Sequence, residues 1–320
     1  MISPGTEAVL VKAGTDKVVR MNNDTYYGGG VVHLSEGPVK LISSEYDENR
    51  FYSFQLMDDR NVNFKNIIRP NGEYYLYYGD KPENMEGVAI ESPSELGIVI
   101  VRVEVKDKND AADVERAQKI YKGLKIEGPE ITKLPVVDVL SSFDDKVVKR
   151  ANEMIDSIYK SVPFYKLAPS PEQIPDETPY LYLAAGSKHA WGAPVAAHST
   201  YQMIHHDVNN EILRGENGTY TFTTEEPSVD AFWSVTVYDS ERGGFLHPNK
   251  DDRYHINNTS AVRNEDGTIT FLFKTQCEDG DINCLEVPAG DFDLTVRYYL
   301  PDEELQIGQW KMPNPKRLND

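Results

Sequence analysis

The chain lacks long apolar runs. None of its 320 residues belongs to a stretch near the roughly 20 apolar residues that a membrane-spanning helix needs. Its first five residues contain neither a basic segment nor an apolar one, so no signal peptide is recognised. We therefore expect no membrane insertion. We expect a cytoplasmic location for the chain as it stands, and an exported or periplasmic one if the chain has been trimmed.

Basic residues are also in short supply. The 33 Lys and Arg residues face 52 Asp and Glu residues, which gives a formal net charge of −19 at pH 7. No basic patch with interleaved aromatic residues occurs. A surface of this kind repels phosphates, so it disfavours anionic membranes, and we exclude nucleic acids as partners. The interspersed charges are typical of a well-solvated acidic surface.

Cysteine is scarce, and the two cysteines flank an acidic loop. Cys277 and Cys284 would pair in an exported protein and would stay free thiols in a cytoplasmic one. The missing signal peptide favours free thiols. Residues 279–283 begin like a calcium loop, but Cys284 stands where the sixth-position glycine is needed and Gly290 where the final glutamate is needed. We predict a flexible acidic loop instead.

Several chemical motifs are missing. The chain has no Gly-x-Ser-x-Gly nucleophile elbow and no phosphate-binding P-loop, and residues 28–30 are three glycines with no helix after them. No cofactor is therefore expected. The histidines at positions 189, 198, 205 and 206 fit no zinc-binding spacing, and adjacent histidines in a strand point to opposite faces. We predict no metal site and interpret these histidines as surface or core-edge residues.

What the chain does contain favours β structure. Nineteen tyrosines and many Val, Ile and Thr residues are typical of strands. Period-two or apolar runs predict strands at residues 31–34, 39–42, 50–58, 97–105, 232–238 and 292–300. The dipeptides Asn71-Gly72 and Asp266-Gly267 predict hairpin turns.

Two segments change to a helical period. Residues 109–123 and a stretch from Ser141 or Ser142 to Val162 carry apolar residues at helical spacing. The apolar stripe of the second helix is predicted to pack against a sheet, and residues 166–192 are predicted to be an irregular connection. The expected fold is mainly β with a few helices: two antiparallel β-sandwich or jelly-roll-like domains joined by a helical segment. The predicted boundaries are 1–128, 129–170 and 171–320.

Ordered motifs along both halves point to a family. In the N-terminal half they lie at residues 22–27, 34–39 and 50–58, and in the C-terminal half at 232–239, 253–256, 266–268, 287–292, 297–301 and 310–313. In order and spacing, these motifs resemble the signature of a bacterial two-domain family, the domains of unknown function 1254 (N-terminal) and 1214 (C-terminal). The resemblance implies paired β-sandwich or jelly-roll domains and specifies no reaction. One departure is Cys284, which stands where the family often has a tryptophan.

Charged residues on the strand-like runs suggest a polar pocket. Arginine cannot lose its charge, so an arginine inside a sheet needs a carboxylate or an anionic ligand beside it. The candidate catalytic acid–base residues are Asp24 and Asp58. The candidate ligand-binding residues are Tyr26, Arg50, Gln55, Arg102, Arg253, Tyr254, Asn257 and Arg297. Such a pocket would recognise a carboxylate or a polyol through arginine and tyrosine side chains.

Two functional hypotheses follow. In the first, the protein binds a small polar or carbohydrate-like molecule and is an enzyme, with hydrolysis by paired carboxylates among the open reactions. In the second, it is a non-catalytic binding or structural module, including a homo-oligomer, and the same arginines and carboxylates are structural ion pairs. The identity of the ligand lies beyond the sequence.

Overall fold

The computed structural model describes residues 8–15, 19–83, 85–129, 142–163, 166–171 and 179–318. They form two compact units, each assembled from separate stretches of chain. Unit 1 comprises residues 1–8, 27–103 and 116–198, and unit 2 comprises residues 9–26, 104–115 and 199–320. The predicted domain boundaries at residues 128 and 170 divide the chain into continuous segments. They remain a prediction.

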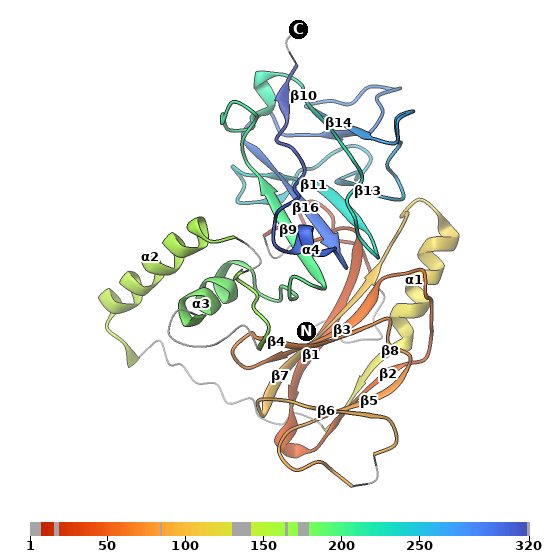
Figure 1. Cartoon of the computed structure of the whole chain (residues 1–320), viewed down its shortest axis with the longest axis vertical. Coiled ribbons are helices and arrows are strands. Elements are labelled where there is room, and N and C mark those ends of the chain that lie inside the picture. The colour runs from red at the N-terminus through yellow and green to blue at the C-terminus, as the bar shows by residue number, and fades with distance from the viewer. Residues whose placement is uncertain are drawn as a thin grey trace. The chain divides into compact units, whose positions relative to one another are not determined.

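Unit 1 is built on two four-stranded sheets (Figure 1). The first has the order β1 (Thr25–His33), β7 (Leu96–Glu104), β3 (Tyr52–Asp58) and β4 (Asn63–Ile68). The second has the order β6 (Val88–Glu91), β5 (Gly72–Tyr77), β2 (Val39–Ser43) and β8 (Leu124–Glu127). Every residue of β3 is buried, so Ser53 and Gln55 on one face are as buried as Phe54 on the other.

The predicted hairpin at Asn71-Gly72 is wrong. Strand β4 pairs with β3, whereas β5 pairs with β2 and β6, so the dipeptide lies between two different sheets. Arg69 and Gly72 both have left-handed backbone angles, with φ values of 47° and 93°. The turn residues therefore redirect the chain from one sheet to the other, and they do not fold it back on itself.

The first predicted helix is confirmed as α1 (Ala111–Gly123). Its residues Ala117, Ile120 and Tyr121 are buried. The Tyr121 hydroxyl donates a hydrogen bond to the backbone oxygen of Tyr27 at 3.1 Å, which ties the helix to β1. The apolar period of the sequence therefore marks the face by which α1 packs.

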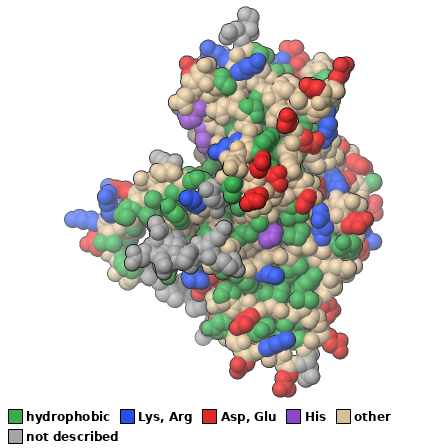
Figure 2. All heavy atoms as spheres, in the orientation of Figure 1, with side chains coloured by type: hydrophobic (Ala, Val, Ile, Leu, Met, Phe, Trp, Pro, Cys, Tyr) green, Lys and Arg blue, Asp and Glu red, His purple; other side chains and the backbone are tan. Residues whose placement is uncertain are grey.

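The second helix forms, but its predicted packing is wrong. Helix α2 (Asp145–Ser161) is capped by Asp144, which accepts a hydrogen bond from the Lys146 amide, while Ser141 lies outside the described residues. Its neighbour is helix α3 (Pro179–His189), and no described residue of α2 is buried. Apolar side chains such as Val147 and Met154 remain on the surface, where Figure 2 shows hydrophobic groups over this helix.

Helix α3 itself falls within the stretch predicted to be irregular. The prolines around it suggested a loop, yet Pro179 is the first residue of the helix. At that position the missing N–H has no helical partner to lose, so proline starts a helix without cost. The prediction of an irregular connection is therefore wrong for residues 179–189.

Unit 2 also contains two sheets (Figure 1). One has the order β12 (Phe245–Leu246), β11 (Trp233–Asp239), β16 (Phe292–Tyr299) and β9 (Ser199–Ile204), with β13 (His255–Asn257) also paired to β11. The other has the order β15 (Cys284–Glu286), β14 (Ile269–Lys274), β10 (Tyr220–Thr224) and β17 (Lys316–Arg317). Short helical turns lie at Leu34–Glu36 in unit 1, and at Gly215–Asn217 and α4 (Glu303–Gln306) in unit 2.

The two sheets of unit 2 share one hydrophobic core. The Trp233 ring from the first sheet meets the Phe271 ring from the second edge to face, with centroids 6.0 Å apart. Val296 and Phe273 belong to the same buried cluster. Residues 232–238 were predicted to form a core strand, and this prediction is confirmed by β11.

Asp266-Gly267 forms a turn but no hairpin of two paired strands. The Gly267 amide donates to the Asn264 oxygen at 3.0 Å, as a turn requires. Residues 260–263 form no strand, however, and β14 pairs with β10 and β15. The hairpin prediction is thus wrong, because the preceding segment is held by turn hydrogen bonds and not by a ladder.

The expectation of free thiols is also wrong. Cys277 and Cys284 form a disulfide, with Cα atoms 6.0 Å apart. The intervening loop brings β15 back parallel to β14 and aligns Cys284 with Leu272. This return path places the two cysteines next to each other, and sequence spacing alone does not reveal it.

The predicted fold class, mainly β with a few helices, is confirmed. The jelly-roll connectivity stays a prediction. Within the described ranges, no helix combines the length and apolar character that crossing a bilayer requires. On the face shown in Figure 2, acidic and basic side chains are interspersed.

Candidate functional site in unit 2

Strand β11 presents two different faces. Its odd-numbered residues from Trp233 to Val237 lie in the hydrophobic core, and Ser234, Thr236 and Tyr238 alternate with them on the opposite face. Cross-strand pairing with β13 and β16 places further polar residues on that opposite face. We call this set the polar face: Ser234, Thr236, Tyr238, His255, Asn257, Asp293, Thr295 and Arg297. All of them are buried except His255, which is half-buried.

Arg297 lies at the centre of the polar face. Its Nη1 donates to the Thr236 hydroxyl at 3.2 Å, and its Nη2 donates to the Tyr238 hydroxyl and to the Arg20 backbone oxygen, both at 2.8 Å. The guanidinium also lies over the rings of Tyr201 and Tyr238, 5.8 and 5.6 Å from their centroids. Among the described residues no carboxylate forms an ion pair with it.

The chain segment of residues 20–24 crosses the polar face. Arg20 forms an ion pair with the buried carboxylate of Asp293, in which Nη2 lies 3.0 Å from Oδ2. Asn22 donates to the Tyr299 hydroxyl at 2.7 Å, and the Tyr238 hydroxyl donates to the Met21 oxygen at 2.7 Å. These bonds hold the segment in place and so position the residue that follows them, Asp24.

Asp24 is the most unusual residue of the site. Its side chain is fully buried, yet neither carboxylate oxygen has a hydrogen-bond partner among the described residues. The ionisable groups that sense the charge of Asp24 are Arg297, Tyr238 and His255. A buried carboxylate without partners is costly, so these oxygens are suited to accept hydrogen bonds from a group that comes from outside the chain.

Two buried atoms of the polar face also lack partners in the described part of the chain. They are the Ser234 hydroxyl and Nδ1 of His255. His255, on β13, pairs directly with Thr236 on β11. The candidate site therefore consists of the Asp24 carboxylate, a hydroxyl and an imidazole nitrogen around the fixed guanidinium of Arg297.

Burial and charge set the protonation states of the site. Burial lowers the pKa of His255, although Asp24 opposes that shift. Burial raises the pKa of Tyr238 to about 12, against the effect of Arg297. Burial alone would lower the pKa of Arg297, but Tyr238 and Asp24 outweigh it and the pKa is raised. Near neutral pH the site thus holds a neutral imidazole, a neutral phenol and a charged guanidinium.

The other predicted site residues of unit 2 have different surroundings. Tyr26 is buried near the start of β1. The Asn257 side chain donates a hydrogen bond to the Lys106 oxygen at 3.1 Å and accepts hydrogen bonds from the amides of the turn that follows it. Arg253 is exposed, and the Tyr254 hydroxyl donates to Asp252 at 2.7 Å. Asp24 and Arg297 are thus brought together, whereas Arg253 and Tyr254 are engaged elsewhere.

The predicted residues of unit 1 form a separate group. Arg102 and Gln55 are bonded to each other, and both bind the Gly192 oxygen, at 2.7 and 3.1 Å respectively. Nε of Arg50 lies 3.7 Å from an Asp47 oxygen. These contacts connect neighbouring parts of unit 1.

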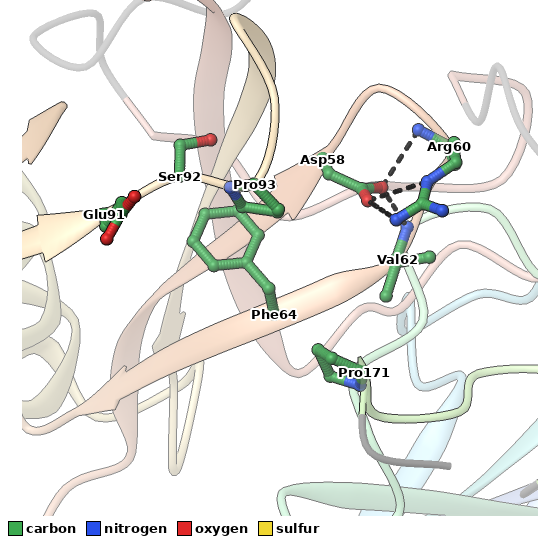
Figure 3. A pocket seen from close by; sticks show the side chains of 8 residues that line it. All are labelled: Asp58, Arg60, Val62, Phe64, Glu91, Ser92, Pro93 and Pro171. Carbon is green, nitrogen blue, oxygen red and sulfur yellow. Dashed lines mark hydrogen bonds and ion pairs between the residues drawn. The ribbon is translucent and has the colours of Figure 1, made fainter. Parts of the chain in front are cut away.

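Asp58 belongs to a tight loop in unit 1. Its Oδ1 accepts hydrogen bonds from the amides of Arg60 and Val62, and its Oδ2 accepts from Nε and Nη2 of Arg60. The carboxylate therefore holds the loop and the Arg60 side chain in place. A pocket of 480 Å³ lies beside this loop, and Figure 3 shows the residues that line it. Asp58 belongs to unit 1 and Asp24 to unit 2.

Sequence reasoning missed Ser234, Tyr238 and His255. Their signal was the alternation in residues 232–238, in which small and polar residues interrupt the apolar ones. The pairing of β13 with β11 then brings His255 to the same face. That pairing is long-range information, which a single sequence does not display.

Metal-ligand geometry occurs at one place in the described chain. Donor atoms of Cys277, Asp281 and Cys284 lie within 4.8 Å of one another, but the two sulfurs are bonded together and Asp281 pairs with Lys274 at 2.9 Å. The predicted histidines are dispersed: His189 contacts Asp156 at 2.7 Å and His198 contacts Asn66 at 2.9 Å.

Comparisons with known proteins identify two domains. The family described as "Protein of unknown function (DUF1254)" matches residues 5–128, and that described as "Protein of unknown function (DUF1214)" matches residues 198–303. No curated protein matches the chain.

Solved structures share the fold. The VPA0106 protein from Vibrio parahaemolyticus matches with a TM-score of 0.78 at 18% identity, over 93% of this chain and 90% of that one. A putative uncharacterized protein from Burkholderia cenocepacia matches with a TM-score of 0.54 at 13% identity, over 98% and 82% of the two chains. At these identities the likeness shows the fold alone.

Proposed function

The chain belongs to the family that pairs a DUF1254 with a DUF1214 domain, and we propose that its unit 2 binds a small polar molecule at Asp24 and the polar face. One observation carries the proposal: the Asp24 carboxylate is fully buried and both of its oxygens lack partners in the described chain. A ligand that donates hydrogen bonds would remove the cost of leaving these oxygens unpaired.

The chemistry of the unpartnered atoms selects the ligand class. The Asp24 oxygens accept hydrogen bonds only, and a neutral His255 can accept through Nδ1. Arg297 already donates to Thr236 and to the Arg20 oxygen. A neutral polyol or carbohydrate-like molecule, which offers several hydroxyl donors, therefore suits the site better than a carboxylate does.

The same arrangement supports an enzymatic role. Asp24 would accept a proton from a ligand hydroxyl, and His255, neutral near pH 7, would act as the second proton-transfer group. Arg297 would stabilise the negative charge that develops on the ligand oxygen. The reaction class nearest to this set of residues is hydrolysis or rearrangement of a polyhydroxylated substrate.

The competing proposal is a structural role. Arg20 with Asp293, and Arg297 with Tyr238, tie residues 20–24 to the sheet, and these bonds alone would justify burying charge. In that case the unpartnered atoms would be bridged by buried water. The two proposals differ in whether any ligand alters the stability of the protein.

The test is a titration with two matched sets of probes. Sorbitol, myo-inositol and D-glucose form the polyol set, and succinate and phosphate form the anion set. Binding is measured by calorimetry and by the shift in melting temperature. We expect at least one polyol to bind and the anions not to bind. Asp24→Asn should weaken polyol binding by about tenfold or more, since hydrogen bonds to a charged group are worth about 1.5–3 kcal/mol.

Two variants complete the design. Ser234→Ala removes one hydroxyl and keeps every charge, so its effect on binding should be smaller than that of Asp24→Asn. Asp279→Asn changes an exposed carboxylate and should leave binding intact. If no polyol binds, or if Asp24→Asn changes only the melting temperature, the binding proposal fails and the structural one stands.

The disulfide bears on location. A bonded Cys277–Cys284 pair favours an oxidising compartment, and we propose that the protein resides in one. Fractionation of the native host with thiol labelling tests this proposal. Reduced cysteines in a cytosolic fraction would contradict it.

A further inference from the structure

The pocket of unit 1 has walls of two kinds (Figure 3). On one side, Asp58 and Arg60 lie together at the loop after β3. On the other side, Glu91, Ser92 and Pro93 follow one another at the end of β6, and Phe64 of β4 also lines the pocket. The pocket volume of 480 Å³ is in the range that small-molecule sites occupy.

The charged side of the pocket is rigid. Nε and Nη2 of Arg60 hold one Asp58 oxygen at 3.1 and 2.9 Å, and Asp58 is itself fixed by two backbone amides. Arg60 is therefore held in place, although its side chain is 54% exposed. The guanidinium and the carboxylate neutralise each other at short range, so this side carries no net charge.

Glu91 supplies the remaining charge. It is exposed, and within the described residues it takes part in no ion pair. The charged groups that line the pocket therefore leave one net negative charge beside the apolar surfaces of Phe64, Val62 and Pro93. The net charge of −19 on the whole chain adds to the attraction for cations and to the repulsion of anions.

We propose that this pocket binds an organic cation: an amine with a compact apolar or aromatic body. The ammonium group would pair with Glu91, and the body would pack on Phe64 and Pro93. An aromatic ring also attracts a cation placed over its face, and the ring of Phe64 is available for this interaction. The site uses no residue of the polar face, so it stands independently of the function proposed for unit 2.

The test compares three probes that share one apolar body. Phenethylamine is positive, 2-phenylethanol is neutral and phenylacetate is negative at pH 7. Ligand-observed saturation-transfer NMR on the full chain gives the Kd of each. We expect phenethylamine to bind about fivefold more tightly than the alcohol, which is the scale of an exposed ion pair, and phenylacetate to bind more weakly than both. Raising the salt concentration should weaken amine binding alone.

Variants locate the binding. Glu91→Gln should reduce the affinity for phenethylamine to that for 2-phenylethanol, and Phe64→Leu should weaken both probes. Glu48→Gln removes an exposed carboxylate away from the pocket lining and should change neither. If the alcohol binds as tightly as the amine, if Glu91→Gln has no effect, or if no probe binds, the proposal is overturned. Glu91 is on the surface, so its replacement leaves the fold intact.

Discussion

The buried hydroxyl of Tyr238 accepts a hydrogen bond from Nη2 of Arg297 at 2.8 Å and donates one to the Met21 oxygen at 2.7 Å. One phenol thus joins two strands of the sheet to the segment that crosses it. Replacing this hydroxyl would leave both the guanidinium and the carbonyl short of a partner inside the protein.

Tyr238→Phe should therefore lower the free energy of unfolding by about 1–3 kcal/mol, the cost of leaving buried polar groups unsatisfied. Chemical denaturation followed by fluorescence measures the change. Tyr78→Phe, at a tyrosine whose side chain is 48% exposed, is the matched control and should have almost no effect. Equal effects of the two variants would show that the Tyr238 hydroxyl does not hold the segment.

Asp24 and Arg297 should be energetically coupled. Asp24→Asn removes a carboxylate whose charge the buried Arg297 senses without forming an ion pair with it, so we expect a loss of about 1–2 kcal/mol in unfolding free energy, less than breaking a buried ion pair costs. Arg297→Met should cost a similar amount. The double variant should cost clearly less than the two single changes together, because each removes the charge that the other leaves behind.

Denaturant titrations of the wild type, both single variants and the double variant form the complete cycle. Additive losses would mean that the two charges do not sense each other. In that case Asp24 would need another explanation for its burial.

Acidification should destabilise the protein through His255. Burial lowers the pKa of His255 from its ordinary value of 6.5, so below that value the unfolded chain takes up a proton that the folded chain refuses. The unfolding free energy should fall as the pH drops from about 7 and should level off below the lowered pKa. His255→Gln should make this decline shallower.

The measurement is a series of urea titrations between about pH 5 and pH 7.5. Part of the slope should remain in the variant, because burial also lowers the pKa of His198, His205 and His247. A variant with the same slope as the wild type would refute a role for His255 in acid sensitivity.

The disulfide should contribute measurably to stability. It closes a short loop between residues 277 and 284, for which the loss of chain entropy in the unfolded state corresponds to about 2–3 kcal/mol. Reduction should lower the unfolding free energy by that amount. The variant with serine at both positions should have the lower stability and should not respond to reductant.

Thiol labelling before and after reduction provides the second readout. The native protein should take up no alkylating reagent until a reductant is added, and two groups per chain thereafter. Labelling without reduction would show that Cys277 and Cys284 are free in solution.

The spacing of apolar residues predicts the strands and helices whose buried face it marks. The alternation in residues 292–300 correctly places Leu294 and Val296 in the core and Thr295 and Arg297 on the other face of β16. In contrast, the turn dipeptide Asn71-Gly72 does not indicate which sheet the next strand joins, so its predicted hairpin is wrong. Helix α3 was missed because proline ends some helices and begins others.

The candidate site shows the same division. Asp24 and Arg297 were identified as charged residues on strand-like runs, which is a property of the sequence. His255 and Tyr238 join them only through the pairing of β11 with β13 and β16. Burial of the Asp24 carboxylate without a hydrogen-bond partner is likewise a three-dimensional property, and the neighbouring sequence does not predict it.

Unit 2 joins the beginning of the chain to its end, and this has a consequence for synthesis on the ribosome. Arg20 and its partner Asp293 are 273 positions apart. At elongation rates of about 5–20 residues per second, residues 20–24 emerge roughly 14–55 seconds before the strand that they cover. A nascent chain must therefore keep Asp24 and its neighbours in water until β16 is made, and a protein expressed as separate halves would have to reunite them from two molecules.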